Sequence, residues 1–425
     1  MVKIIVWFAK RLLDTVDRLT TTPAIVVIVL LSISVKLSYI LILGGGLGTF
    51  PNEGSDVWFI SRATQNILQH GVYGMEADQP TAGAPPGQAV FLAILFTISN
   101  NSLVFAKLAH LALLTLVAVL VYLMGRELFS PSVGFGAGVL IAIDPAYAYL
   151  SGTFLSEPLY ICLMTLAFYS LIRHRSNKNL VWLMIAGLCF GHAGLTRNEG
   201  WLFAIVLVFS AMITRGRVIA IRTSLVVLAV TVVVIAPWTY RNFRVTDKFV
   251  PVSLNGGLTL WSGNNPEFRY RQPMPMSLPI YATPPGLSGA EVDQYYRQKA
   301  IDWITDHPVR FAFNGLVKVA ALYNFDPYSS RPEVSGIFRL AGLFPYGIML
   351  PFIFLGLFEQ LRNPDLWLIL TYIIWTTLLA AVFFGDSRVR TPIQPYLYML
   401  GSAWLVNRLR RVLDIEYNPT STYQI

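Results

Sequence analysis

Long apolar runs separated by short polar segments dominate the chain. About 20 apolar residues suffice for a helix to cross the hydrocarbon core of a bilayer, and about ten runs approach that length. They cover roughly residues 22–45, 103–124, 132–151, 155–173, 179–196, 200–214, 218–240, 340–361, 364–385 and 388–407. The pattern predicts an all-α polytopic membrane protein built as a bundle of about ten transmembrane helices.

Two further segments are too short or too polar to be counted with these spans. The apolar stretch 87–99 would reach only ~20 Å as a helix, so we expect it to dip into the outer leaflet. The helix beginning at Pro308 carries Arg310 and Lys318 and is the candidate for an eleventh span. If it crossed, the basic residues after it would change sides, which favours ten.

Basic residues fall in clusters between the apolar runs and set the orientation. The clusters are the N-terminal lysines and arginines, Arg126, Arg173 to Lys178, Arg215 to Arg222, Arg362, and Arg408 to Arg411. With ten spans, all of them lie on one side, which the positive-inside rule identifies as cytoplasmic. The first loop (46–102) and the long segment 241–307 then lie outside.

This topology divides the chain into three parts. Residues 1–240 form an N-terminal transmembrane module with the first loop 46–102, and its first apolar run is interpreted as a retained signal anchor. Residues 241–307 form an outer loop, with a hairpin predicted around Asn255-Gly256-Gly257 and a helix from a capping box at Ser288 to Asp306. Residues 308–425 supply C-terminal membrane helices and a cytoplasmic tail.

Composition agrees with a membrane protein and narrows the chemistry. The chain is 55% hydrophobic and 13% charged, which is too apolar for a soluble core. Its 32 Lys and Arg exceed 23 Asp and Glu, but their clustering between spans argues against nucleic-acid binding. The two cysteines lie in apolar runs, and the five histidines lack metal-ligand spacing. No cofactor is predicted, and the need for a divalent metal stays open.

The polar stretch after the first apolar run offers the candidate for acid–base chemistry. Asp56 lies in the first turn of a predicted helix whose Phe59, Ala63 and Ile67 share one face. A carboxylate at a dry interface suits a general base, whereas the simpler interpretation is a first-turn acid that favours the helix dipole. Glu53, three residues earlier, is a second candidate.

Several cations and carboxylates are predicted on the same outer side. Arg197 and Glu199 lie in a tight turn, where either Arg197 binds a phosphate and Glu199 orients it or the substrate, or the two form an ion pair that holds the turn. Arg241 either contacts phosphate or extends its charge from the membrane to water beside an aromatic belt. Asp386, Arg388 and Arg390 lie at the entrance to the last span, where one arginine is expected to pair with Asp386 and the other to remain available for an anion.

Three polar residues complete the candidate set. Glu157 stands before Pro158 at the start of the fourth span and serves either as a helix-start residue or in the site. Asn264 and Asn265 are most simply a turn, with sugar hydrogen bonding as the alternative. Carboxylates and guanidiniums on one face of an apolar bundle suit a lipid-borne phosphate, which Arg binds with two parallel hydrogen bonds.

The order of these motifs resembles a known family. The matching pieces are Asp56 with Phe59, Ala63 and Gly71; Ala84 to Gly87 before Phe91; Ser156 to Leu159; Gly194 to Gly200; Pro237-Trp238 with Arg241-Asn242; Gly263 to Pro266; and Ser387 to Arg390 with Pro392 and Pro395. Together they resemble bacterial C-type membrane glycosyltransferases, which are related to protein O-mannosyltransferases and the lipid A aminoarabinose transferase. In this chain Ser55 precedes Asp56, where many relatives carry an acidic pair.

The resemblance implies an inverting glycosyltransferase at the outer face of the bacterial cytoplasmic membrane. Its donor would be a polyprenyl-phosphate sugar, and its acceptor a hydroxyl of a glycan, a lipid or a protein. By this analogy Asp56 is the base, and Arg197, Arg241 and Arg388 or Arg390 bind the donor phosphate. A transporter or flippase for a lipid-linked glycan remains the alternative.

Overall fold

Helices account for nearly all of the regular structure in the computed structural model. The model describes residues 10–11, 13–51, 54–212, 217–268, 279–287, 289–325 and 341–413. The helices are α2 (Thr21–Ile42), α3 (Gly54–His70), α4 (Gly87–Ser99), α5 (Leu103–Leu128), α6 (Pro131–Ile143), α7 (Pro145–Ser151), α8 (Glu157–Asn177), α9 (Val181–Thr196), α10 (Glu199–Ala211), α11 (Arg217–Thr246), α12 (Gly256–Gly263), α13 (Gly289–Asp306), α14 (Pro308–Leu322), α16 (Ile348–Gln360), α17 (Trp367–Val382), α18 (Ser387–Arg390) and α19 (Gln394–Val412). Short strands β1 (Gly74–Glu76) and β2 (Gln79–Pro80) pair in antiparallel fashion in the first loop.

The predicted membrane spans coincide with helices, although not every helix is long enough to cross a bilayer by itself. Among the described residues, five helical segments meet the length and hydropathy expected of a span: α2, α5, most of α11, and the segments 343–360 and 364–382. Helices α6 and α7 bend by 54° at Asp144 and add a sixth if counted together. A multi-pass membrane protein is therefore supported, while the count of ten stays a prediction.

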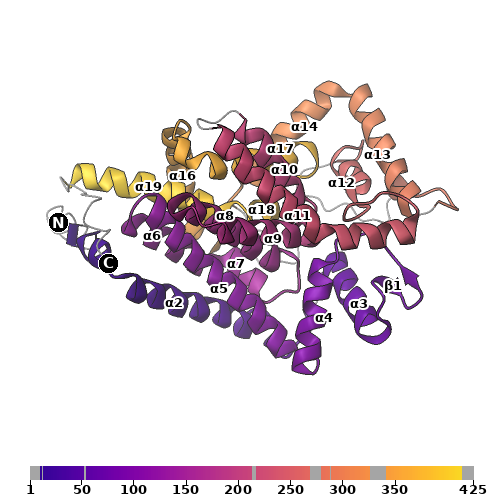
Figure 1. Ribbon diagram of the computed structural model, residues 1–425, viewed down its shortest axis with the longest axis horizontal. Helices are drawn as coiled ribbons and strands as arrows, with labels where there is room; N and C mark the ends of the chain where they lie inside the picture. The colour runs from indigo at the N-terminus through magenta and orange to yellow at the C-terminus, as the bar shows by residue number, and fades with distance from the viewer. Residues whose placement is uncertain are drawn as a thin grey trace.

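Ion pairs gather the predicted cytoplasmic helix ends at one end of the bundle. Asp17 binds Arg410 at 2.7 Å, and Glu127 at the end of α5 binds Arg173 of α8 at 3.3 Å. Arg175 of α8 also pairs with Asp365, just before α17. The labelled α3, β1, α12 and α13 lie at the opposite end (Figure 1). The basic clusters near these ion pairs therefore share one end, as the orientation argument requires.

An aromatic core joins the helices that carry the polar residues of the far end. Phe168 of α8 lies 4.9 Å, centroid to centroid, from Tyr396 of α19, and Phe203 of α10 lies 4.9 Å from Tyr372 of α17. Aromatic pairs of this kind add to the free energy of burial. They fix four helices whose ends are far apart in the sequence.

The predicted hairpin in the outer loop is wrong. Residues 256–263 form helix α12, which packs on α13. A Cβ on Gly257 would lie 1.9 Å from the carbonyl oxygen of Asp293, and the Gly257 amide donates to the Asp293 carboxylate at 2.6 Å. Gly257 permits this close helix contact, and these glycines do not form a hairpin turn. The predicted helix ending at Asp306 is confirmed as α13, whereas its predicted cap, Ser288, lies outside the described residues.

The two short segments outside the predicted spans are both helical. The stretch 87–99 is α4, as expected, and the helix beginning at Pro308 is α14. At 1.5 Å per residue α14 reaches only ~22 Å, and the residue that follows it contacts the middle of α16 and the segment just before that helix. Tyr323 packs 5.8 Å from the ring of Phe354 and accepts a hydrogen bond from Tyr346 at its carbonyl oxygen.

Candidate active site

Helix α3 holds Asp56 at the rim of the polar end. Phe59, Ala63 and Ile67 bury one face of α3 against Tyr73, so the shared face predicted from the sequence is confirmed. Asp56 lies in the first turn with 49% of its side chain exposed. Glu53 lies outside the described residues. The base candidate is therefore accessible to a substrate and is held by a helix that packs against Tyr73.

Glu157 is the buried centre of the site. It opens α8 directly before Pro158, and only 1% of its side chain is exposed. Its Oε1 accepts hydrogen bonds from Arg197 Nη1 at 2.9 Å and from Arg388 Nε. Its Oε2 is buried and receives no hydrogen bond from the described residues. A buried carboxylate bound by two guanidiniums is held in one orientation.

Arg197 enters the site from the turn between α9 and α10. Gly200 allows this turn, because a Cβ there would lie 2.6 Å from backbone atoms of Ala193 and Gly194. Arg197 Nε donates to Glu199 at 2.9 Å, and its guanidinium lies 5.8 Å from the ring centre of Tyr160. Burial opposes the charge on Arg197, but Glu199 and Glu157 outweigh it and raise the pKa of the guanidinium.

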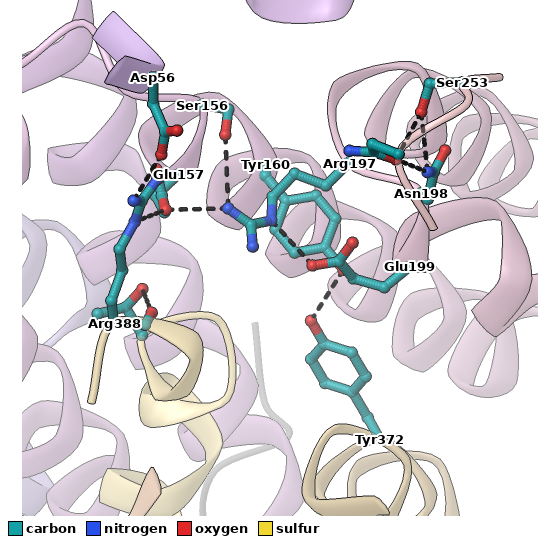
Figure 2. Close-up of polar contacts among 12 residues, drawn as sticks. Asp56, Ser156, Glu157, Tyr160, Arg197, Asn198, Glu199, Ser253, Tyr372 and Arg388 are labelled. Carbon is teal, nitrogen blue, oxygen red and sulfur yellow. Dashed lines mark hydrogen bonds and ion pairs between the residues drawn. The ribbon is translucent and has the colours of Figure 1, made fainter. Parts of the chain in front are cut away.

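Arg388 completes the set by joining Glu157 to Asp56. Its Nη1 donates to Asp56 Oδ2 at 2.7 Å across 332 positions of sequence. Asp56, Arg388, Glu157, Arg197 and Glu199 thus follow one another, and we name them the carboxylate–guanidinium chain (Figure 2). Three carboxylates and two guanidiniums leave it with one net negative charge.

Both arginines keep a nitrogen available for a further acceptor. Nη2 of Arg197 and Nη2 of Arg388 donate to none of the described residues. The side chains of Arg197 and Arg388 are 22% and 19% exposed, and neither Nη2 is among the buried polar atoms that lack a partner. A guanidinium carries five N–H donors. The two arginines can therefore bind an anion without releasing Glu157.

The chain is similar to known proteins both in sequence and in fold. Residues 83–240 match the family model described as dolichyl-phosphate-mannose-protein mannosyltransferase. Oligosaccharyltransferase structures from Archaeoglobus fulgidus superpose on 95% of this chain in the apo form and on 94% in a complex with an inhibitory peptide and a dolichol-phosphate. Their TM-scores are 0.56 and 0.55, each at 13% sequence identity. The predicted resemblance to the C-type membrane glycosyltransferases is confirmed.

The C-type relatives are considerably longer than this chain. It spans 53% and 52% of the two archaeal chains. The dolichyl-diphosphooligosaccharide–protein glycosyltransferase subunit stt-3 of Caenorhabditis elegans is 26% identical over 184 residues, which is 38% of this chain and 24% of that protein. At 13% identity the archaeal structures establish the C-type fold, and not the substrate.

Two of the predicted phosphate-binding arginines lie apart from the carboxylate–guanidinium chain. Arg241 donates to the carbonyls of Thr81 at 2.5 Å and Tyr73 at 3.1 Å and lies 4.7 Å from the ring centre of Trp238. Arg390 is 1% exposed and donates to the carbonyl of Leu322 at 3.1 Å and to that of Asn324. Arg241 fastens the first loop, and Arg390 fastens the end of α14.

The remaining predicted site residues also serve the framework. Asn264 donates to Val382 O at 2.8 Å and accepts from Lys318 at 3.0 Å. Asn265 donates to Trp261 O at 2.8 Å, and both asparagines are fully buried. Asp386 is buried before α18 and accepts from the Ser387 hydroxyl at 3.0 Å. The predicted turn at Asn264 and Asn265 therefore agrees better with this geometry than sugar binding does.

Two residues absent from the predicted set belong to the site. Tyr160 lies three positions after Glu157 on the same face of α8, a spacing that could have revealed it. Asn198 donates to Ser253 Oγ at 2.9 Å and to Asn255 Oδ1 at 2.8 Å (Figure 2). These bonds tie the Arg197 turn to the segment that leads into α12. No local signal in the sequence identifies the partners of Asn198.

Proposed function

We propose that the protein transfers a sugar from a polyprenyl-phosphate donor to an acceptor hydroxyl, with inversion, at the outer face of the bacterial cytoplasmic membrane. The observation that carries this proposal is the pair of arginines that share Glu157. Each has an accessible Nη2, and the pair lies at the end of the bundle opposite the basic clusters. Guanidinium groups bind phosphate through paired, charge-assisted hydrogen bonds, so two adjacent ones suit a phosphate.

The net charge of the carboxylate–guanidinium chain indicates how the phosphate of the sugar donor binds to it. The carboxylate–guanidinium chain already has a net negative charge, so a phosphate gains most by replacing a carboxylate. Asp56 is the candidate for replacement because it is half exposed, whereas Glu157 is buried. As the donor phosphate binds Arg388, Asp56 is released from its ion pair. Donor binding thereby separates Asp56 from Arg388, so that its carboxylate can accept a proton from the acceptor.

The reaction then proceeds as a single displacement. Asp56 takes the proton of the acceptor hydroxyl as that oxygen attacks the anomeric carbon, and the bond from this carbon to the phosphate oxygen breaks. The phosphate leaves with the electron pair, stabilised by Arg388 and Arg197. Attack from the face opposite the leaving group inverts the anomeric carbon. Asp56 then returns its proton to water.

Similarity to known proteins supports the donor class. The matching family model is that of dolichyl-phosphate-mannose-protein mannosyltransferases, and one archaeal structure of the same fold was solved with a dolichol-phosphate. Both names contain a dolichol-type phosphate, which is a phosphate attached to a long isoprenoid. The sugar and the acceptor are not assigned, because the identity is low and the chain spans only about half of those structures.

The test is release of free polyprenyl phosphate by the purified protein. A panel of polyprenyl-phosphate hexoses and pentoses is incubated with the protein and a membrane extract that supplies acceptors, and the lipid product is measured by mass spectrometry. We expect wild type to release polyprenyl phosphate and Asp56→Asn to lose ~10²–10⁴-fold in rate. A transporter would move the donor without this product. No release from any donor, or equal release by Asp56→Asn, would contradict the proposal.

A further inference from the structure

The space between two carboxylates is the usual place for a divalent cation, and here a side chain occupies it. Arg388 places Nη1 against Asp56 at 2.7 Å and Nε against Glu157. We propose that the Arg388 guanidinium takes the place of a divalent metal ion, so that this protein binds its donor and works without one. The catalytic part of this inference rests on the proposed function, whereas the absence of metal binding does not.

A structure of a protein with the same fold contains a metal ion. One Archaeoglobus fulgidus oligosaccharyltransferase structure, which superposes on 92% of this chain with a TM-score of 0.55, was solved as a complex with Zn and sulfate. In the described part of this chain, no group of three or more His, Cys, Asp and Glu side chains is arranged to hold a metal ion. A metal ion was therefore present in a structure of the same fold, but the described residues of this chain do not form a comparable site.

The carboxylate oxygens of Asp56 and Glu157 that could coordinate a metal ion already accept hydrogen bonds from Arg388. A zinc site needs three or four protein ligands, whereas Mg²⁺ is often held by one or two carboxylates together with the phosphate of the substrate, so Asp56 and Glu157 are the pair to consider. Asp56 Oδ2 and Glu157 Oε1 both face the Arg388 guanidinium, so a metal ion would have to displace that side chain. Only 19% of the Arg388 side chain is exposed, and its two ion pairs oppose such a movement.

Glu157 Oε2 is the remaining acceptor that could attract a cation. It is buried and unpartnered among the described residues. However, the other oxygen of the same carboxylate holds two guanidiniums, those of Arg197 and Arg388. A divalent cation on Oε2 would lie within a few ångströms of both positive charges, with little water to screen the repulsion. A neutral donor such as a hydroxyl meets no such repulsion, so Oε2 suits a hydroxyl better than a metal.

Arg388 also supplies what a metal would contribute. A metal at this position would neutralise the leaving phosphate and orient the carboxylates. Arg388 holds Glu157 in place throughout, holds Asp56 until the donor binds, and then offers its nitrogens to the phosphate. Unlike a metal ion it does not dissociate, and its charge is independent of pH over the physiological range. The site would therefore be insensitive to chelators.

The test measures metal binding without relying on activity. Full-length wild type, purified in detergent without chelator, is analysed by elemental mass spectrometry and by thermal unfolding with and without excess MnCl₂ or ZnCl₂. We expect far less than one metal ion per chain and no shift in melting temperature. A bound metal ion near one per chain that Asp56→Asn or Glu157→Gln removes would overturn the inference.

The variant Arg388→Met adds a converse test, because it exposes the two carboxylates to each other. We expect MnCl₂ to raise the melting temperature of Arg388→Met but not that of wild type, and the added substitution Asp56→Asn to abolish the rise. No response of a folded Arg388→Met would count against the idea that Arg388 fills a cation position. If the proposed function is correct, EDTA leaves polyprenyl-phosphate release unchanged. Loss of release with EDTA and its recovery with Mn²⁺ would overturn metal independence alone.

Discussion

The substitution Glu157→Gln tests whether one buried charge organises the site. Glutamine keeps the size of the side chain and a neutral acceptor but removes the charge that Arg197 and Arg388 share. Glu157 is 1% exposed, whereas the other partners of these arginines, Glu199 and Asp56, are 31% and 49% exposed. The remaining carboxylates are thus more strongly screened by water and compensate the guanidiniums less well.

The magnitude follows from this difference in burial. Removing one partner of a buried ion pair costs about 3–5 kcal/mol, because a charge remains uncompensated. Each arginine retains a second carboxylate, so we expect the lower end, about 3 kcal/mol. For a chain of this size ~2 °C of melting temperature corresponds to 1 kcal/mol. Glu157→Gln should therefore melt ~6 °C below wild type.

The assay is thermal unfolding of the purified protein in detergent, followed by tryptophan fluorescence. Glu127→Gln at the opposite end is the matched control, because Glu127 is 17% exposed and pairs at 3.3 Å with an Arg173 that is 38% exposed. Such a partly exposed pair contributes at most about 1 kcal/mol. If Glu157→Gln lowered the melting temperature no more than Glu127→Gln does, Glu157 would not organise the site.

Three further substitutions test separate parts of the account. Arg388→Lys cannot bridge Asp56 and Glu157 with one ammonium group, so the rate of polyprenyl-phosphate release should fall ~10²–10³-fold, and a fall below threefold would contradict the bridge. Arg390→Met should lower the melting temperature by several degrees, since charged hydrogen bonds to two carbonyls contribute ~1.5–3 kcal/mol each, while polyprenyl-phosphate affinity stays within threefold of wild type. Gly200→Ala should destabilise by ~1–3 kcal/mol in the same unfolding assay, because its Cβ would meet backbone at 2.6 Å. Gly256→Ala, whose Cβ would meet nothing within 4 Å, is the control, and equal melting temperatures would argue against the close turn.

The sequence predicted the helices well because a bilayer leaves few alternatives. A run of about 20 apolar residues must satisfy its backbone hydrogen bonds internally, so its length and position follow from composition alone. The helix start at Asp56, the proline-led start of α8 and the turn at Arg197 follow from equally local signals. The pair Gly256-Gly257 misled because glycine, which favours turns, also permits close helix packing, and Gly257 serves the latter.

The grouping of the site residues could not be derived in the same way. Arg241, Arg388 and Arg390 all stand at the ends of apolar runs, and nothing in their neighbours distinguishes a phosphate-binding arginine from a structural one. The distinction depends on which groups the folded bundle brings near: backbone carbonyls for Arg241 and Arg390, and Asp56 with Glu157 for Arg388. Contacts across more than 300 positions arise only when the bundle closes.

The most direct test of the central claim is binding of polyprenyl phosphate, the product shared by every donor considered, to purified protein in lipid nanodiscs. The account predicts that Arg388→Met and Arg197→Met each weaken binding at least tenfold, which is ~1.4 kcal/mol. Asp56→Asn should bind as tightly as wild type or more tightly, since it no longer competes for Arg388. Unchanged affinity in both arginine variants, or an Asp56→Asn variant weakened as much as they are, would contradict the claim that Asp56 yields Arg388 to the donor phosphate.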